Sequence, residues 1–173
     1  QEVEVINGMR NIITLFVEAN VNLLLTSQNG VFVRYFEEEE EKEVYRERQE
    51  YALRQMISLF PHLIESAGFT DLEGNVISSV ANWNSLNGIN KQLSIADQPL
   101  YNKILTLKTG EVHYDTPEIS HISGRLVIPA ATPVFGRQGS LYGVLFANIY
   151  LDGVTQSIRN ISAPEDTVLV INE

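Results

Sequence analysis

The spacing of apolar residues in this 173-residue chain changes near residue 65. Before that point they recur at steps of three and four, which is typical of helices, and after it they alternate, which is typical of half-buried strands. Both kinds of segment carry one apolar face, and both faces are buried when helices pack on an antiparallel sheet. The change of period therefore predicts an α+β fold, with a long N-terminal helix packed on a central antiparallel sheet of five to six strands.

The first 60 residues are predicted to be helical. Apolar side chains recur along residues 5–25, and Gly30 is a natural residue for the end of that helix. Further helical segments are expected at 31–36 and from about 37 to 60, where Pro61 ends the last one. This last segment begins with five consecutive glutamates, which point around most of a helix instead of converging. We interpret them as a solvated face, in preference to a metal site or a site for a basic partner.

The apolar stripe of the first helix is broader than one buried face requires. We therefore expect this helix to bury one face on its own domain and another on a second copy, forming a homodimer. Asn20 fills a gap in the stripe, and we interpret it either as a residue that fixes the register of two paired helices or as a helix edge that meets water. The main stripe consists of Ile6, Met9, Ile13, Phe16 and Leu23, and Val5, Ile12, Val17, Ala19, Val21 and Leu24 widen it.

The remaining chain alternates between strand patterns and turn signals. A hairpin is predicted at residues 69–78, and a loop rich in Asn, Ser and Gly follows at 81–90. A short helix is expected to start at 97–99, with Asp97 as its N-cap, and to end at Gly110. The later predicted elements are strands 111–119, 125–135 and 140–151, a turn at 136–139, a helix at 152–161 and a closing strand at 167–172.

Composition excludes several classes of function. With 22 acidic and 12 basic residues the net charge is −10, which disfavours binding to nucleic acid or to anionic lipid. The absence of cysteine excludes disulfides, thiolate metal sites and a thiol nucleophile. No run of 18 apolar residues is present, so we expect no membrane span within these residues. Because the chain opens inside a helix pattern and closes inside a strand pattern, we expect it to be a piece of a longer protein.

Catalysis is not expected. The chain has three histidines, and neither a G-x-S-x-G nor an H-E-x-x-H pattern occurs. Ser120, His113 and Asp115 have the residue types of a catalytic triad, but no such motif supports that arrangement. A metal site from His113, His121, Asp115 and Glu118 has suitable ligand types, but exposed or ligand-contacting polar residues explain them as well. We therefore predict no enzyme activity, no metal and no cofactor.

The strand at 141–151 suggests a binding surface. Its odd-numbered residues are apolar or small and suit packing under the helices. Its even-numbered residues mix aromatic rings with an amide, as an amphipathic ligand pocket requires, although a partly solvated sheet face would look the same. They are Tyr142, Val144, Phe146, Asn148 and Tyr150. Arg125, near the start of the neighbouring strand, could hold a ligand carboxylate, or be an ordinary surface arginine.

Two segments carry a resemblance to a known family. The segment FTDLEGNVI at 69–77 is similar to the hairpin that opens the sheet of Cache domains, also called PDC sensor domains, which have a PAS-like fold. Residues 128–151 resemble the pair of terminal strands in that family. The resemblance implies a periplasmic ligand-sensing domain of a membrane-tethered histidine kinase, chemoreceptor or cyclic-dinucleotide enzyme. It divides the chain into a helical stalk at 1–36 and a single sensor domain at 37–173.

The resemblance also implies a set of ligand-binding residues. The amino-acid-binding branch of the family has an Arg-x-Trp-Tyr motif, which is missing here, and an aspartate in the last strand, where this chain has Asn148. We therefore expect a carboxylate or a neutral polar ligand in preference to a zwitterionic amino acid. The alternative function is a PAS- or profilin-like protein-interaction module without a small ligand. With Tyr142 from strand parity, the predicted site residues are Trp83, Tyr101, His113, Tyr114, Asp115, Arg125, Tyr142 and Asn148.

Overall fold

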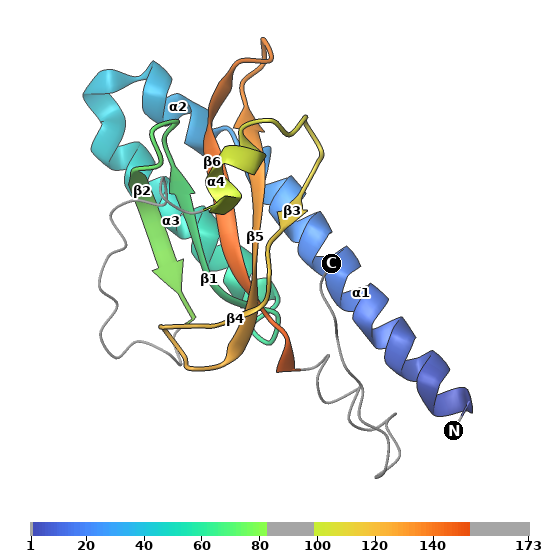
Figure 1. Ribbon diagram of the computed structural model, residues 1–173. Helices are drawn as coiled ribbons and strands as arrows, with labels where there is room; N and C mark the ends of the chain where they lie inside the picture. Colours follow the sequence, from blue (N-terminus) through green and yellow to red (C-terminus); the bar gives the residue numbers. More distant parts are fainter. Residues whose placement is uncertain (1, 83–98, 153–173) are drawn as a thin grey trace.

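The computed structural model describes residues 2–82 and 99–152 (Figure 1). The helices are α1 (Glu2–Ser27), α2 (Val31–Glu37), a 3₁₀ turn η1 (Glu39–Glu41), α3 (Lys42–Leu59) and α4 (Pro99–Ile104). The strands are β1 (Ile64–Thr70), β2 (Val76–Ala81), β3 (His113–Tyr114), β4 (Glu118–Ile119), β5 (Leu126–Phe135) and β6 (Leu141–Tyr150). Within the described residues, no helix is long and apolar enough to cross a membrane.

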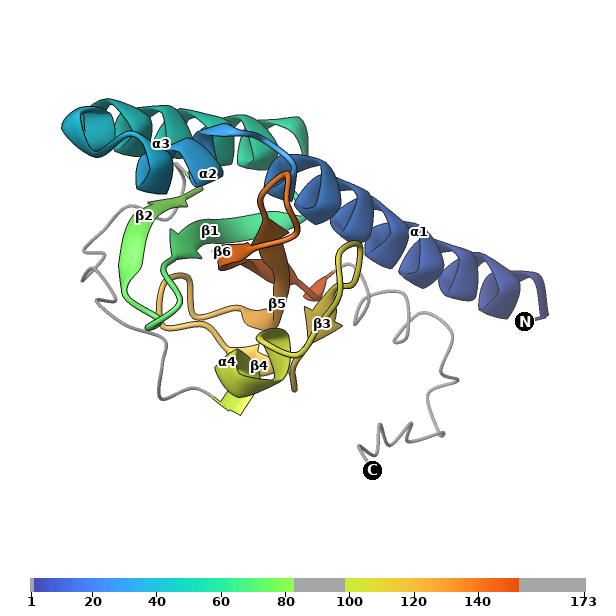
Figure 2. The same ribbon diagram turned by 90° about the horizontal axis from the view of Figure 1, so that it is seen from above.

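The strands form one antiparallel six-stranded sheet with the order β2-β1-β6-β5-β3, and β4 pairs with another part of β5. Viewed from above, α1, α2 and α3 lie on one side of this sheet and α4 lies on the other (Figure 2). We call these sides the helical face and the distal face. The predicted α+β architecture, with the N-terminal helix packed on the sheet, is confirmed.

The main core lies between α1–α3 and the helical face. Phe32 of α2 and Phe69 of β1 are both fully buried, and their ring centroids are 4.9 Å apart. Burying an aromatic side chain of this size contributes about 1.5–3 kcal/mol to folding. The helical face supplies Ala67, Phe69, Ala130, Leu145, Ala147 and Ile149, and the helices supply Ala19, Leu23, Phe32, Leu53, Met56 and Ile57.

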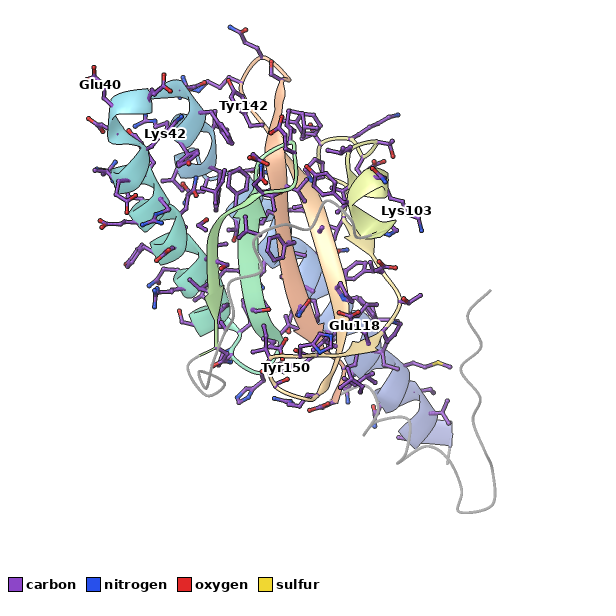
Figure 3. All side chains as sticks on the ribbon, turned by 60° about the vertical axis from the view of Figure 1, so that its left-hand side comes forward. Glu40, Lys42, Lys103, Glu118, Tyr142 and Tyr150 are labelled. Atoms are coloured by element: carbon purple, nitrogen blue, oxygen red, sulfur yellow. The ribbon has the colours of Figure 1, made fainter. Side chains whose placement is uncertain are left out.

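Strand β6 follows the predicted alternation except at its start. Phe135 pairs with Leu141 but Val134 pairs with Gly143, so Tyr142 is an extra residue in a β-bulge. Its ring therefore lies 5.7 Å from that of Phe36 in α2, and its hydroxyl donates to Glu37 Oε1 at 3.2 Å. The prediction that Tyr142 shares a face with Asn148 is wrong, because strand parity changes at a bulge. Figure 3 shows Tyr142 beside α2, far along the strand from Tyr150.

Gly143, next to the bulge, brings β6 very close to β1. A Cβ atom at this position would lie 2.0 Å from the carbonyl oxygen of Thr70. No side chain fits there, so the glycine is required by contact distance.

The predicted helix from 97 to 110 is shorter than expected, since α4 ends at Ile104 and turns continue to Gly110. The predicted strand 111–119 consists of two separate pairs of residues, β3 and β4. Between them the N–H of Thr116 donates to the Asp115 carboxylate, and Pro117 has no N–H to donate to a neighbouring strand. The acidic run at 37–41 is exposed, as predicted. The loop around Trp83, the N-cap at Asp97, nearly all of the helix at 152–161 and the strand at 167–172 lie outside the described residues.

Candidate functional site

Upper and lower refer to the view of Figure 1, in which α4 covers the upper half of the distal face. Tyr101 and Ile104 of this helix are buried against Ala131 of β5 and Val144 of β6. The Tyr101 hydroxyl donates to the carbonyl oxygen of Asp71 at 2.9 Å, and burial raises the pKa of this phenol. Tyr101 therefore docks α4 onto the sheet, and its predicted ligand contact stays a prediction.

The lower half of the distal face is built around a buried carboxylate, Glu65. This side chain is 0% exposed and sits in β1, where the pairing with β6 shifts by one residue between Ile64 and Ser66. Its oxygens accept hydrogen bonds from Ser120 Oγ at 2.7 Å, from Ser123 Oγ, and from Asn148 Nδ2 at 3.1 Å. We call these four residues the Glu65 network.

Above this network, an aromatic ring and an imidazole lie in one row across the distal face. The strand pairing aligns His113, Ala131, Phe146 and Gly68. A Cβ atom on Gly68 would lie 2.3 Å from Phe146 Cζ, so the half-buried ring rests directly on the backbone of β1. Nε2 of His113 is buried and has no hydrogen-bond partner in the described part of the chain. An unpaired buried nitrogen of this kind is uncommon and needs an explanation, such as a bound ligand group or water.

Arg125 lies at the lower edge of the distal face. Its guanidinium is 3.7 Å from the ring centre of Tyr150, and its Nε donates to Asp152 Oδ2 at 2.5 Å. The predicted binding of a ligand carboxylate by Arg125 is not tested by this geometry, but such a ligand would compete with Asp152.

Tyr114, next to His113 in β3, points to the helical face. Its ring meets that of Phe16 edge-on at 5.1 Å, and its hydroxyl donates to Asn20 Oδ1 at 2.5 Å. Burial raises the pKa of Tyr114 to about 12. Asn20 is partly buried and contacts its own sheet through its amide oxygen, and its role in the register of two paired helices stays a prediction.

The structure brings together only part of the predicted site. His113 and Asn148 lie on the distal face, Tyr101 covers it and Arg125 borders it. Tyr114 and Tyr142 point to the helical face, Asp115 caps the turn after β3, and Trp83 lies outside the described residues. Glu65 was missed, although a single carboxylate inside an otherwise apolar and small-residue strand is a visible signal.

The residues considered for catalysis are not assembled for it. The Ser120 hydroxyl donates to Glu65, the Asp115 carboxylate accepts from Thr116 N at 2.8 Å, and His113 Nε2 bonds to neither of them. Among residues 2–82 and 99–152, no group of three His, Cys, Asp or Glu side chains could hold a metal ion.

Comparisons with known proteins give a clear result only for the fold. No family model matches the chain, and no curated protein matches it significantly. The sensor domain of the histidine kinase DctB from V. cholerae matches with a TM-score of 0.68 at 18% identity, over 90% of this chain and 57% of that one. The ligand-binding domain of the chemoreceptor PctB from Pseudomonas aeruginosa PAO1, in complex with L-Gln, matches with 0.61 at 16% identity, over 91% and 57%.

A third structure, the ligand-binding domain of the Pseudomonas fluorescens chemoreceptor CtaA in complex with L-alanine, matches with a TM-score of 0.61 at 14% identity, over 90% of this chain and 60% of that one. The chain thus spans less than two thirds of the length of these domains. It has the fold of these sensor and ligand-binding domains, as the resemblance to Cache domains implied.

Proposed function

We propose that this chain is the extracytoplasmic, periplasmic ligand-sensing domain of a membrane-tethered signal-transduction protein, such as a histidine kinase, chemoreceptor or diguanylate cyclase. The observation that carries this proposal is the unequal use of the two sheet faces. Helices α1–α3 cover one face with an apolar core, whereas the distal face combines the Phe146 ring, which packs against the α4 cluster, with an unpaired imidazole nitrogen and the Glu65 network. Apolar walls with a few fixed polar groups are what a small-molecule site requires. We expect no catalysis by this domain.

Strand β3 offers a route from the ligand site to α1. Its two residues are consecutive and point to opposite faces, with His113 toward the ligand side and Tyr114 toward Asn20 and Phe16 of α1. A ligand that binds His113 would therefore shift the contacts that position α1. The fold neighbours support a role in signalling, since they include domains of a histidine kinase and of chemoreceptors.

Helix α1 supports the proposal of a homodimer. Seven large apolar side chains on it are at least half exposed, and they follow one another at steps of three or four residues. They lie opposite the side that carries Ala19 and Leu23, and the N-terminal half of α1 projects beyond the sheet (Figures 1 and 2). We call them the exposed row: Val3, Ile6, Met9, Ile13, Val17, Val21 and Leu25. A second copy of the helix is the partner that matches such a row.

The alternative function, a PAS- or profilin-like interaction module, requires an exposed apolar sheet face. Among the described residues, the large exposed apolar side chains lie on α1, α3, the β1–β2 turn and β4, and β1, β2, β5 and β6 carry none. This distribution favours the ligand-sensing function.

The test is a thermal-shift screen of the purified chain with organic acids, amines, sugars and nucleobases. A ligand at about 100 times its Kd stabilises the folded state by about 2.7 kcal/mol, which corresponds to a rise in Tm of about 5–10 °C for a domain of this size. If no compound in these classes raises Tm, the proposed small-ligand function is contradicted.

A further inference from the structure

We propose that the chain has a second binding site, away from the distal face, and that this site takes a phosphorylated sugar. The site is a cavity of about 840 Å³ where the α1–α2 turn, α2, the start of α3 and the β5–β6 turn meet. Figures 1 and 2 show α2 beside the β5–β6 turn, on the side of the sheet opposite to α4. We call it the tip cavity. Its volume lies within the range of about 300–1,000 Å³ that is typical of small-molecule sites.

Three arginines line the tip cavity, and each comes from a different element. Arg34 lies in α2, Arg48 in α3 and Arg137 in the β5–β6 turn. In the described part of the chain none of these three forms an ion pair with a carboxylate, whereas four other basic side chains do. Three unpaired guanidinium groups at one cavity, in a chain of net charge −10, indicate an anionic ligand.

The number of guanidinium groups favours a phosphate over a carboxylate. A phosphate monoester has three terminal oxygens and a charge of about −1.5 to −2 at pH 7, so it can bond to more than one arginine at a time. A carboxylate has two oxygens and a single charge, which one bidentate arginine satisfies. The tip cavity therefore fits a phosphate group best.

Two carboxylates at the tip cavity indicate what else the ligand carries. Glu37 Oε1 accepts a hydrogen bond from the Tyr142 hydroxyl at 3.2 Å, and Glu38 Oε2 accepts one from the Tyr45 hydroxyl at 3.0 Å. No other described side chain donates to either carboxylate, and a carboxylate offers about four acceptor positions. Most of these positions are open to hydroxyl groups of a ligand, whereas a second phosphate near them would be repelled.

The amides at the tip cavity fit the same ligand. Gln28 and Gln138 have no side-chain hydrogen-bond partner within the described residues, and an amide both donates and accepts, as pairing with sugar hydroxyls requires. Binding of an apolar ligand here would remove water from guanidinium, carboxylate and amide groups without replacing their hydrogen bonds. One phosphate and several hydroxyls are together the groups of a phosphorylated sugar.

The experiment is isothermal titration of the 173-residue chain with glucose 6-phosphate, ribose 5-phosphate and N-acetylglucosamine 6-phosphate. The matched probes are each sugar without its phosphate, glucuronate, which carries a carboxylate instead, and inorganic phosphate. We expect at least one of the phosphorylated sugars to bind. Its unphosphorylated form, glucuronate and inorganic phosphate should each bind at least about 10-fold more weakly, since each lacks hydrogen bonds to a charged group.

Variants test whether the phosphorylated sugar occupies the tip cavity. Arg48→Gln and Arg137→Gln are each expected to weaken binding about 10- to 100-fold, and both side chains are exposed, so Tm without ligand should stay unchanged. Arg10→Gln is the matched control, since it removes an exposed arginine from the N-terminal half of α1, and it should bind like the wild type.

Three results would overturn the inference. They are no binding of any of the three phosphorylated sugars, equally tight binding of glucuronate or inorganic phosphate, and unchanged affinity in both Arg48→Gln and Arg137→Gln. The last result would mean that the phosphorylated sugar binds elsewhere on the domain. None of these results bears on the proposed sensing function, because the thermal-shift screen tests the distal face with other compounds.

Discussion

Replacing Ile13 by Glu in α1 is expected to prevent self-association of the domain. Ile13 lies in the middle of the exposed row, and 63% of its surface is open to solvent in the single chain. In the proposed dimer this side chain would be covered by the partner helix, and a carboxylate at the same position would lose its hydration on association. The substitution changes nothing in the core, because Ile13 has no part in it.

The size of the effect follows from the exposed area. Full burial of an isoleucine contributes about 1.5–3 kcal/mol, so covering the exposed part of Ile13 contributes about 1–2 kcal/mol per copy. Both copies are changed together, and the desolvation of two carboxylates adds to the loss. A total of at least about 3 kcal/mol corresponds to a dissociation constant more than about 100-fold weaker.

Sedimentation equilibrium over a wide range of concentrations measures this directly. The wild type should show a monomer–dimer equilibrium, and Ile13→Glu should stay monomeric with an unchanged circular dichroism spectrum. Asn11→Glu is the matched control, since it adds the same charge on an exposed part of α1 away from the row. The reasoning is refuted if both variants associate like the wild type, or if the wild type is monomeric at the highest concentration.

Three further predictions concern stability and the ligand site. Gly143→Ala should destabilise the fold by more than about 3 kcal/mol in urea unfolding, because its Cβ would overlap a backbone oxygen. The control Gly30→Ala has open space around the new Cβ and should change stability little. Equal effects of the two substitutions would contradict this prediction. The raised pKa of Tyr114 contributes stability that is fully present below pH of about 10 and is lost as the pH rises toward about 12. The wild type should therefore lose more stability over that interval than Tyr114→Phe. Parallel curves of stability against pH for the two proteins would disprove this. Arg125→Ala and Trp83→Ala are each expected to abolish any ligand-induced rise in Tm without unfolding the apo protein, and an unchanged rise in both would remove them from the site.

The fold could be predicted from the sequence because its periodicities are strong and local. Steps of three and four residues located α1 and α3, and alternation together with turn residues located the hairpin at 69–78 and the pair β5–β6. The short strands β3 and β4 could not be predicted as separate elements, since two residues carry no measurable period. Their pairing depends on the backbone of β5, which is distant in sequence.

The candidate site was harder to predict because it lies where the regular pattern is interrupted. Strand parity placed Phe146 and Asn148 correctly on the distal face, but the bulge at Tyr142 moved that side chain to the opposite face. The register shift in β1 has a similar consequence, because it brings Glu65 next to Asn148. Bulges insert one residue without a clear signal in composition, so parity holds only between them.

The energy available for signalling through β3 can be bounded from the contacts of Tyr114. One hydrogen bond to Asn20 contributes about 0.5–1.5 kcal/mol, and the edge-on contact with Phe16 contributes about 0.5–1.5 kcal/mol. A ligand that acts on His113 can therefore shift the position of α1 by at most about 3 kcal/mol through this route, or about 150-fold in an equilibrium constant. That range is sufficient for a sensor only if the two arrangements of α1 are close in free energy without ligand, because a ligand shifts an equilibrium by no more than its difference in affinity for the two states. A weak association through the exposed row of α1, as proposed, would provide such a balance, whereas a very stable helix pair would need more energy to rearrange than the Tyr114 contacts can supply.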